Sequence, residues 1–252
     1  MEIEDKILLE TCIEATRAAA DHALTHWDRR IEINVAASHD IKLVLDVESQ
    51  AKAEAVIQQR YPHHDILGEE GQQQADSRFR WIIDPIDGTM NFARGLPHWC
   101  STVAVQYQET TVAGCVYCPV LEENYTATLQ GPAQCNGQLI YASDTTEVAE
   151  ATLLFGPGKP DEETGYDISR FQKLINEARI GRMQGAAAID ICWVADGRVD
   201  AYVDNGIYLW DYAAAGLIAE RAGAKTALTS EIAPFQHAYL ASTPAIFESL
   251  RP

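Results

Sequence analysis

The segment from Trp81 to Pro97 constrains the fold of this chain more than any other stretch of it. Its first residues, Trp81-Ile82-Ile83, are bulky and partly β-branched, which favours a buried strand. Pro85 pushes Asp84 into an extended conformation and has no N–H, so the strand ends there and the backbone turns. Asp87-Gly88 is a second turn signal, and a helix is expected to follow. The segment therefore predicts a strand, a turn and a helix in immediate succession.

The two aspartates of this turn point to a cation site. Asp84 and Asp87 lie three residues apart, and their charges repel each other unless something positive lies between them. A divalent ion is the simplest candidate. The free N–H groups at a helix start after Gly88 and Thr89 would attract phosphate. Metal and phosphate are therefore expected at one place, although a lone D-P-x-D is more often an ordinary turn with a helix cap.

The overall charge limits the partners. The 252 residues suffice for one large domain or two lobes. The chain has 37 acidic and 19 basic residues, which gives a net charge of −18. This charge repels nucleic acid and anionic membranes, so we expect neither as a partner. The same charge repels a phosphorylated substrate, so a phosphate-binding site needs local positive charge, which a bound metal supplies.

The acidic start of the chain lacks the basic and apolar regions of a signal peptide, and no apolar run approaches the ~20 residues of a membrane span. We therefore expect a cytoplasmic protein. Its six cysteines are then expected to be free thiols. Cys115 and Cys118 have the spacing of a zinc or redox pair, but no second pair completes a zinc site and Val112 to Val120 reads as an apolar strand, which predicts core thiols.

The order of patterns predicts two lobes. Apolar residues at helical spacing predict an amphipathic helix from Glu2 to about Trp27. Two strands joined near Gln108-Glu109 are expected between Ser101 and Val120, as part of an antiparallel sheet. The polar segment near Ser143 to Ala149 is the expected boundary between an N-terminal lobe, 1–145, and a C-terminal lobe, 146–252, in which strands and helices alternate.

Three more acidic residues stand at the ends of elements. Asp46 and Asp211 are each expected to be the N-cap of a helix, and the cap alone would explain either of them. Glu69 follows a short strand 15 residues before Asp84, so two strand-turn units could bring both acids to one sheet edge. Alone, Glu69 would more often be solvated surface charge. Further along, Val199 to Val203 reads as a strand.

Four separated segments resemble motifs of the inositol monophosphatase family, a family of magnesium-dependent, lithium-sensitive phosphatases. They occur in the family's order and approximate spacing and cover essentially the whole chain. The segments are Gly68-Glu69-Glu70, Asp84 to Thr89 with Asn91-Phe92, Arg182 to Ala188, and Trp210-Asp211. The resemblance implies a layered αβαβα sugar-phosphatase fold of the mixed α+β and α/β type, with an antiparallel sheet in the N-terminal lobe and an α/β C-terminal lobe. It also implies a homodimer.

The resemblance assigns roles to residues of this chain. Two or three Mg²⁺ ions, or Mn²⁺, would be held by oxygen ligands, which these ions prefer. The implied metal ligands are Glu69, Asp84, the Ile86 carbonyl, Asp87 and Asp211. The implied catalytic residues, which orient or activate water, are Thr89, Glu69 and Asp46. The implied substrate-binding residues are Asp87, Gly88, Thr89, Ala187, Asp204 and Asp211.

This chain also departs from the family pattern. Asp40 to Asp46 resembles the motif D-x-V-T-x-x-D but carries Leu43 in place of the threonine. Ala36 to Ser38 stands where many members have a lysine, so a third ion stays open. Asp204 stands where inositol-binding members have a glutamate that contacts substrate hydroxyls, so the substrate stays open as well.

The expected activity is hydrolysis of a phosphomonoester by in-line attack of water. The expected substrate is a small polyol or sugar phosphate, with inositol monophosphate first. Histidinol phosphate, fructose 1,6-bisphosphate and 3'(2'),5'-bisphosphate nucleotides are alternatives on the same site. A non-catalytic, metal-stabilised binding or regulatory protein is the alternative from a different class.

Overall fold

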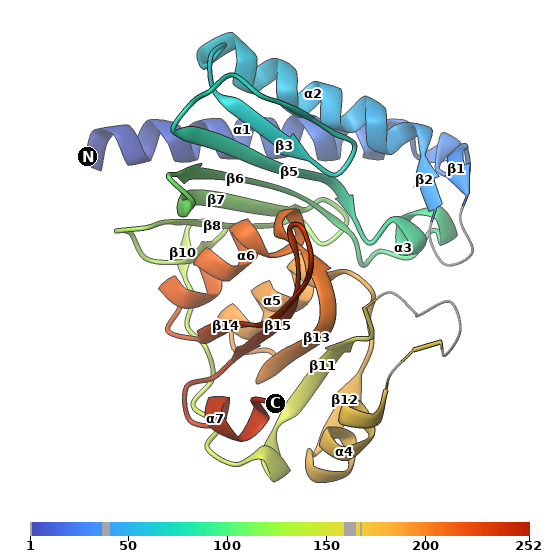
Figure 1. Ribbon diagram of the computed structural model, residues 1–252, viewed down its shortest axis with the longest axis vertical. Helices are drawn as coiled ribbons and strands as arrows, with labels where there is room; N and C mark the ends of the chain where they lie inside the picture. The colour runs from blue at the N-terminus through green and yellow to red at the C-terminus, as the bar shows by residue number, and fades with distance from the viewer. Residues whose placement is uncertain (1, 37–40, 159–164, 167) are drawn as a thin grey trace.

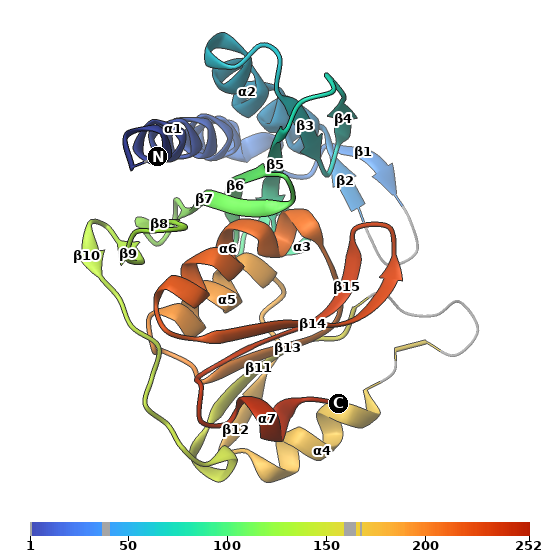
Figure 2. The same cartoon turned by 60° about the vertical axis from the view of Figure 1, so that its left-hand side comes forward.

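Two large β-sheets and three layers of helices alternate through the molecule (Figures 1 and 2). The structure is a computed structural model that describes residues 2–36, 41–158, 165–166 and 168–252. Its main helices are α1 (Glu2–Thr25), α2 (Val44–Arg60), α3 (Thr89–Arg94), α4 (Ser169–Glu177), α5 (Ala187–Ala195), α6 (Leu209–Arg221) and α7 (Phe247–Leu250). Helices α1 and α2 form one outer layer, α5 and α6 lie between the sheets, and α4 and α7 form the other outer layer. The expected αβαβα fold is confirmed.

The first sheet has eight strands in the order β10-β9-β8-β7-β6-β5-β3-β4. They are β3 (Asp65–Gly68), β4 (Gly71–Gln73), β5 (Phe79–Asp87), β6 (Cys100–Tyr107), β7 (Thr110–Cys118), β8 (Glu123–Thr128), β9 (Gln134–Cys135) and β10 (Gln138–Leu139). Strand β3 runs parallel to β5, and the other neighbours are antiparallel. The predicted pair of strands between Ser101 and Val120 is therefore confirmed as β6 and β7. Outside this sheet, β1 (Ile33–Ala36) pairs with β2 (Ile41–Leu43).

Strand β5 is buried on both faces. Trp81 and Ile83 pack among apolar residues of α1 and α2, whereas Ile82 faces the opposite way and joins the core around α5 and α6. This alternation follows from the period of two in a strand, and it explains why the strand reads as a continuous apolar run. The sheet thus holds the turn after β5 firmly between two helical layers.

The second sheet has the order β12-β11-β13-β15-β14. Its strands are β11 (Thr152–Gly156), β12 (Ile180–Arg182), β13 (Ala201–Tyr208), β14 (Lys225–Ala233) and β15 (Gln236–Ser242). Strand β13 is longer than the predicted strand, which ended at Val203. The chain passes from the first sheet to the second between β10 and β11, and the core around α5 and α6 includes residues of both sheets. A division into lobes at 145 and 146 stays a prediction.

Helix α6 lies close against β7 because the contact consists of small residues. A Cβ atom at Gly114 would lie 2.9 Å from Ala214 Cα. Gly114→Ala is therefore expected to lower the free energy of unfolding by about 1–3 kcal/mol, since the helix has to move away from the sheet. Chemical denaturation measures this, with Thr110→Ala at the exposed start of the same strand as the control. Equal unfolding free energies for the two variants would contradict the tight contact.

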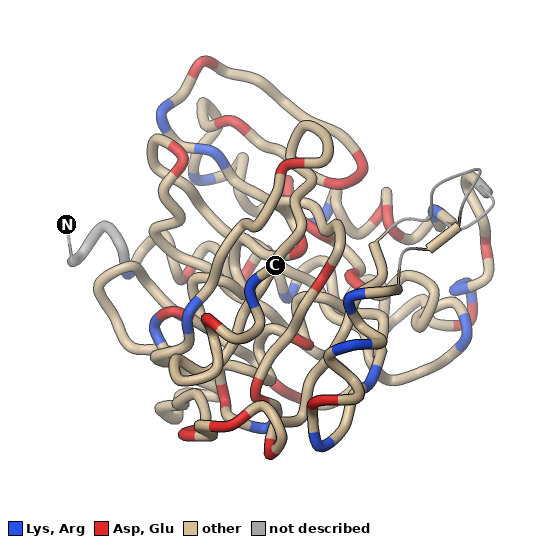
Figure 3. The backbone as a smooth tube through the Cα atoms, turned by 60° about the horizontal axis from the view of Figure 1, so that its bottom comes forward, with Lys and Arg blue, Asp and Glu red and all other residues tan. Residues whose placement is uncertain are grey.

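The six cysteines are free thiols, as expected, and Cys115 and Cys118 are buried in β7. Within the described residues no helix is long and apolar enough to cross a membrane. Acidic residues are spread along the chain rather than gathered in one segment (Figure 3). Of the sequence features discussed above, Ala37, Ser38 and Asp40 lie outside the described residues.

Candidate metal centre

Strands β3 and β5 bring Glu69 and Asp84 to the same edge of the first sheet. The strands are parallel, Gly68 lies opposite Ile83, and the Glu69 N–H donates to the Ile83 carbonyl at 3.1 Å. Lys42 adds a tie from outside, because its Nζ lies 3.0 Å from Oε1 of the neighbouring Glu70. The arrangement predicted from the 15-residue spacing is therefore present.

The last residues of β5, from Asp84 to Asp87, and the turn after them are held by their own polar groups. Asp84 Oδ1 accepts the Ile86 N–H at 3.0 Å, and the Thr89 hydroxyl donates to the Ile86 carbonyl at 3.0 Å. Gly88 has a φ of +86°, and a Cβ atom there would lie 3.0 Å from the Ala186 Cβ. Glycine is therefore required both by the backbone conformation and by the close approach of another segment.

Asp46 and Asp211 occupy equivalent positions in α2 and α6. Both helices begin two residues before the aspartate, so each aspartate is the third residue of its helix. Oδ2 of Asp46 accepts the Leu43 N–H at 2.6 Å, and Oδ2 of Asp211 accepts the Tyr208 N–H at 2.7 Å. The prediction that the two aspartates are N-caps was wrong, because an acidic side chain at the third position can satisfy a free N–H at the helix start just as a cap does.

Three carboxylates converge where β5 and α6 meet. Oxygens of Asp84, Asp87 and Asp211 all lie within 4.8 Å of one another. Burial, followed by the negative charge of Glu69, raises the pKa of the Asp84 carboxyl well above its usual range. Burial and the charge of Asp87 do the same to the pKa of Asp211. Because repulsion on this scale is relieved by a bound cation, the cluster is suited to hold one.

Asp87 is also bound by the start of α5. Its two carboxylate oxygens accept the N–H groups of Ala187 at 3.1 Å and Ala188 at 2.8 Å. Burial raises the pKa of Asp87 to about 6, while the hydrogen bonds from the backbone oppose that rise. The predicted substrate-side residue Ala187 is thus in direct contact with a predicted metal ligand.

Asp46 lies beside this cluster and is incompletely satisfied. Its Oδ1 is buried and has no hydrogen-bond partner. Burial raises its pKa to about 8, and the negative charges of Glu69 and Glu70 add to the rise. The Thr89 hydroxyl, another of the implied catalytic groups, donates to the Ile86 carbonyl.

The carboxylates open into a cavity of about 470 Å³. It is lined by Glu69, Asp87, Ala187, Asp204 and Asp211, all of which are predicted site residues. Asp204 is almost fully buried, and both its oxygens accept hydrogen bonds, from the Tyr202 hydroxyl and from the Gly206 N–H. The fold therefore brings these five predicted residues to one cavity, with Asp204 engaged by its own strand. The other predicted site residues are not among those that line it: Asp46, Asp84, Ile86, Gly88 and Thr89.

Two aromatic residues of this cavity have no role in the sequence analysis. The rings of Tyr208 and Trp210 stack in parallel, with their centroids 4.7 Å apart, and both line the cavity. Such a flat apolar surface is suited to pack against the carbon face of a ligand. The neighbouring W-D motif drew attention to Asp211, and nothing in the local pattern showed that Tyr208 ends a strand beside it.

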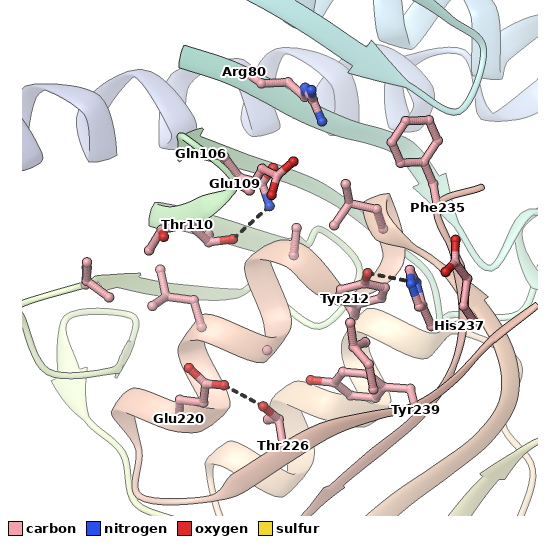
Figure 4. A pocket seen from close by; sticks show the side chains of 18 of the residues that line it. Arg80, Gln106, Glu109, Thr110, Tyr212, Glu220, Thr226, Phe235, His237 and Tyr239 are labelled. Atoms are coloured by element: carbon pink, nitrogen blue, oxygen red, sulfur yellow. Dashed lines mark hydrogen bonds between the residues drawn. The ribbon is translucent and has the colours of Figure 1, made fainter. Parts of the chain in front are cut away.

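A larger cavity of about 830 Å³ lies on the other side of α6, between β6, β7 and the hairpin formed by β14 and β15. Figure 4 shows Arg80, Tyr212, His237 and Tyr239 around it. The Tyr212 hydroxyl pairs with His237 Nδ1 at 3.2 Å. None of the clustered carboxylates lines this cavity, so size alone does not identify the chemical site.

The site fits a hard divalent cation. The donors of the cluster are carboxylate oxygens, and the buried Asp46 Oδ1 beside them lacks a partner. Oxygen-only donors favour Mg²⁺ or Mn²⁺ over zinc. The layered αβαβα fold and this site together define an α/β protein with a centre suited to a divalent cation.

The comparison with family models identifies the group. The model described as the inositol monophosphatase family matches residues 5–248, and the chain therefore belongs to this family. The family supports a phosphatase activity and metal binding for the chain. The resemblance seen in the sequence motifs is thus confirmed.

Curated relatives agree with this assignment. The chain is 35% identical over 221 residues to the Nus factor SuhB of Haemophilus influenzae, covering 86% of this chain and 83% of the relative. It is 33% identical, with the same coverage, to the Nus factor SuhB of Escherichia coli K12.

Solved structures share the fold over nearly the full length. The inositol monophosphatase of Anabaena is 27% identical, with a TM-score of 0.86 over 99% of this chain and 95% of that one. The Thermotoga maritima IMPase is also 27% identical, with a TM-score of 0.84 over 99% and 95% of the two chains.

Proposed function

We propose that this chain is a Mg²⁺-dependent phosphomonoesterase that hydrolyses a small polyol or sugar phosphate, with inositol monophosphate as the first candidate. The observation that carries the proposal is the convergence of carboxylate oxygens of Asp84, Asp87 and Asp211 within 4.8 Å of one another. Asp87, Asp211 and Glu69 also line one cavity. Family membership supports the phosphatase class.

Two or three ions would be held by this site, and Mn²⁺ could replace Mg²⁺. Their ligands would be Glu69, Asp84, the Ile86 carbonyl, Asp87 and Asp211. Bound Mg²⁺ supplies Lewis-acid chemistry: it lowers the pKa of the attacking water and neutralises charge on the phosphoryl group. The backbone and hydroxyl of Gly88 and Thr89 would contact the phosphate.

The protein's own groups position and deprotonate the water. The Thr89 hydroxyl donates to the Ile86 carbonyl, so its oxygen can accept a hydrogen bond from the water and fix the orientation of the water. Asp46 has a buried Oδ1 without a partner, and this oxygen would accept a proton from the water. Glu69 would act on the water through the ion that it helps to hold.

The cavity wall favours a substrate with one phosphate. Among the described residues that line it, none is Lys, Arg or His, so nothing in that lining would neutralise a second phosphate. Tyr208 and Trp210 offer an aromatic surface to the carbon skeleton of a polyol or sugar. Fructose 1,6-bisphosphate and bisphosphate nucleotides are therefore the less favoured alternatives, whereas histidinol phosphate carries one phosphate and stays close behind inositol monophosphate.

A substrate panel tests the proposal. Phosphate release is measured from inositol monophosphate, histidinol phosphate, fructose 1,6-bisphosphate and a 3',5'-bisphosphate nucleotide, with Mg²⁺, with EDTA and with added Li⁺. We expect Mg²⁺-dependent release that is fastest with a monophosphate. Fastest release from a bisphosphate would overturn the substrate assignment, and no release from any substrate would overturn the enzymatic one.

The names of the relatives support a second candidate, a Nus-factor role, which corresponds to the regulatory alternative. Expression of the wild type and of Asp211→Asn in Escherichia coli lacking its own SuhB tests this role. Restoration of Nus-factor activity by both proteins would favour a role independent of catalysis. Restoration by neither would remove the second candidate.

The remaining properties follow from the family resemblance and the charge. We propose Li⁺ sensitivity, a homodimer and a cytoplasmic location. The net charge of −18 supports the absence of direct contacts with nucleic acid or membrane.

A further inference from the structure

One asparagine ties α3 to the segment that precedes α5. The Asn91 side-chain amide donates to the carbonyls of His98 and Gln184, both at 2.8 Å. An amide NH₂ group has two hydrogens, and both are used. Gln184 and the residues after it line the cavity of the metal centre. Asn91 in α3 therefore holds one wall of the cavity in place through Gln184, which is 93 residues further along the chain.

A histidine and an aspartate tie the same two segments together one turn further along α5. His98 Nε2 lies 2.9 Å from Asp190 Oδ1, and the Asp190 side chain is 1% exposed. The His98 ring also meets the Trp193 ring edge to face, with 5.0 Å between centroids. A carboxylate buried this deeply requires a partner, and His98 is the partner that the structure supplies.

The first turn of α5 is where these ties act. Its Ala187 and Ala188 N–H groups hold the two oxygens of Asp87. The segment before it approaches Gly88 so closely that a Cβ at Gly88 would lie 3.0 Å from the Ala186 Cβ and 3.3 Å from the Gly185 carbonyl. A small displacement of α5 would thus rotate Asp87 and alter the wall of the cavity at once.

We propose that Asn91, His98 and Asp190 are positioning residues that fix the start of α5 on the turn after β5, so that Asp87 is held in the orientation needed to bind metal. This inference rests on the proposed function. It adds three residues that touch neither substrate nor metal and act through the backbone of Ala187 and Ala188. Groups that orient a metal ligand from outside commonly change metal affinity or activity by ~10–100-fold when removed.

Metal binding and catalysis are measured separately in variants of the full-length protein. Asn91→Ala and His98→Phe remove the ties, and His98→Gln keeps a donor that can reach Asp190. Tyr125→Phe is the matched control, because the Tyr125 hydroxyl ties the other end of α5 through Asp196 at 2.8 Å. Titration with Mn²⁺, followed by electron paramagnetic resonance, gives the dissociation constant. Phosphate release at saturating Mn²⁺ gives kcat and KM.

We expect the Mn²⁺ dissociation constant to rise ~10–100-fold in Asn91→Ala and His98→Phe. His98→Gln should recover most of that loss, and Tyr125→Phe should keep wild-type Mn²⁺ affinity even if its Tm falls. An Mn²⁺ affinity within twofold of wild type in the first two variants would overturn the proposal while leaving the phosphatase assignment intact. A wild-type protein that binds no Mn²⁺ would overturn both.

His98→Phe leaves Asp190 buried without a partner, which can prevent folding. The double variant His98→Phe/Asp190→Leu also removes the contact between the two side chains, and it leaves no buried carboxylate without a partner. It therefore tests the same proposal. The same rise in the Mn²⁺ dissociation constant is expected there, and an unchanged constant would count against the proposal.

Discussion

Asp211→Asn is expected to abolish phosphate release, lowering kcat by more than ~100-fold, because loss of a ligand should exceed the ~10–100-fold effect of groups that only orient ligands. The variant should keep its fold. Only Oδ2 of Asp211 accepts a backbone hydrogen bond, from Tyr208 at 2.7 Å, and the amide oxygen of asparagine can keep it. Asp87 is less suitable for this test, because both its oxygens accept N–H groups and an amide nitrogen would face one of them.

Asp196→Asn provides the matched control. Asp196 is a mostly buried aspartate at the end of α5, where it accepts a hydrogen bond from the Tyr125 hydroxyl. Steady-state kinetics at saturating Mg²⁺ should show near wild-type kcat for this control. Circular dichroism should show the same helix content for both variants. Near-normal turnover by a folded Asp211→Asn protein would contradict the assignment of the metal centre.

The metal-free protein is expected to lose stability as the pH rises from about 5 to about 8, and Mg²⁺ should abolish that loss. Burial raises the pKa values of four carboxyls, to about 8 for Asp46 and about 6 for Asp87, with Asp84 and Asp211 raised as well. Nearby carboxylates add to the rise for Asp46, Asp84 and Asp211. The folded state therefore binds more protons than the unfolded chain above pH ~4, the usual aspartate pKa. Folding stability then falls with rising pH through the folded pKa values.

Differential scanning calorimetry in EDTA at several pH values measures the effect. A loss of a few kcal/mol lowers the Tm of a chain of this size by roughly 5–10 °C. Because the net charge of −18 also disfavours the folded state at high pH, the comparison with Asp211→Asn is needed, and this variant should show a smaller fall. A metal-free wild type whose Tm is equal or higher at pH 8 would refute the account of a repulsive cluster.

The central part of the site could be predicted from the sequence because each of its turns carries its own signal. Gly88 marks the turn into α3. The predicted strand end at Pro85 was wrong, because β5 continues to Asp87 through an irregularity in its pairing with β6 between Asp84 and Asp87. Glu69 was expected at the same edge from two strand-turn units, and the parallel pairing of β3 with β5 produces that placement. The role of Asp211 as a metal ligand was implied only by the family resemblance, because hydrogen bonding at the helix start is enough to explain a lone aspartate there.

The second sheet shows where local reading failed. The sequence Asp204-Asn205-Gly206 is typical of a turn, so the predicted strand ended at Val203. In the structure β13 continues to Tyr208 through an irregularity between Asp204 and Ile207, and the Gly206 N–H donates to Asp204 at 2.6 Å. The polar residues form a bulge inside a strand, and only the pairing with β15 determines this.

Contacts between distant segments carried no local signal at all. Asn91, His98 and Asp190 are ordinary polar residues in the sequence, and their spacing gives no motif. They come together because α5 packs against the turn after β5, which is a property of the whole fold. The burial of Asp190 in particular cannot be predicted from the amino-acid sequence, because an aspartate on a helix is exposed in most proteins.

Isotope labelling tests the central claim most directly. Wild-type protein with Mg²⁺ and inositol monophosphate is incubated in ¹⁸O-labelled water, and the products are analysed by mass spectrometry. Attack of water on phosphorus predicts one ¹⁸O atom in each released phosphate, none in the polyol, and no release when EDTA is present. Label in the polyol, or release that persists without metal, would contradict the proposed chemistry of this site.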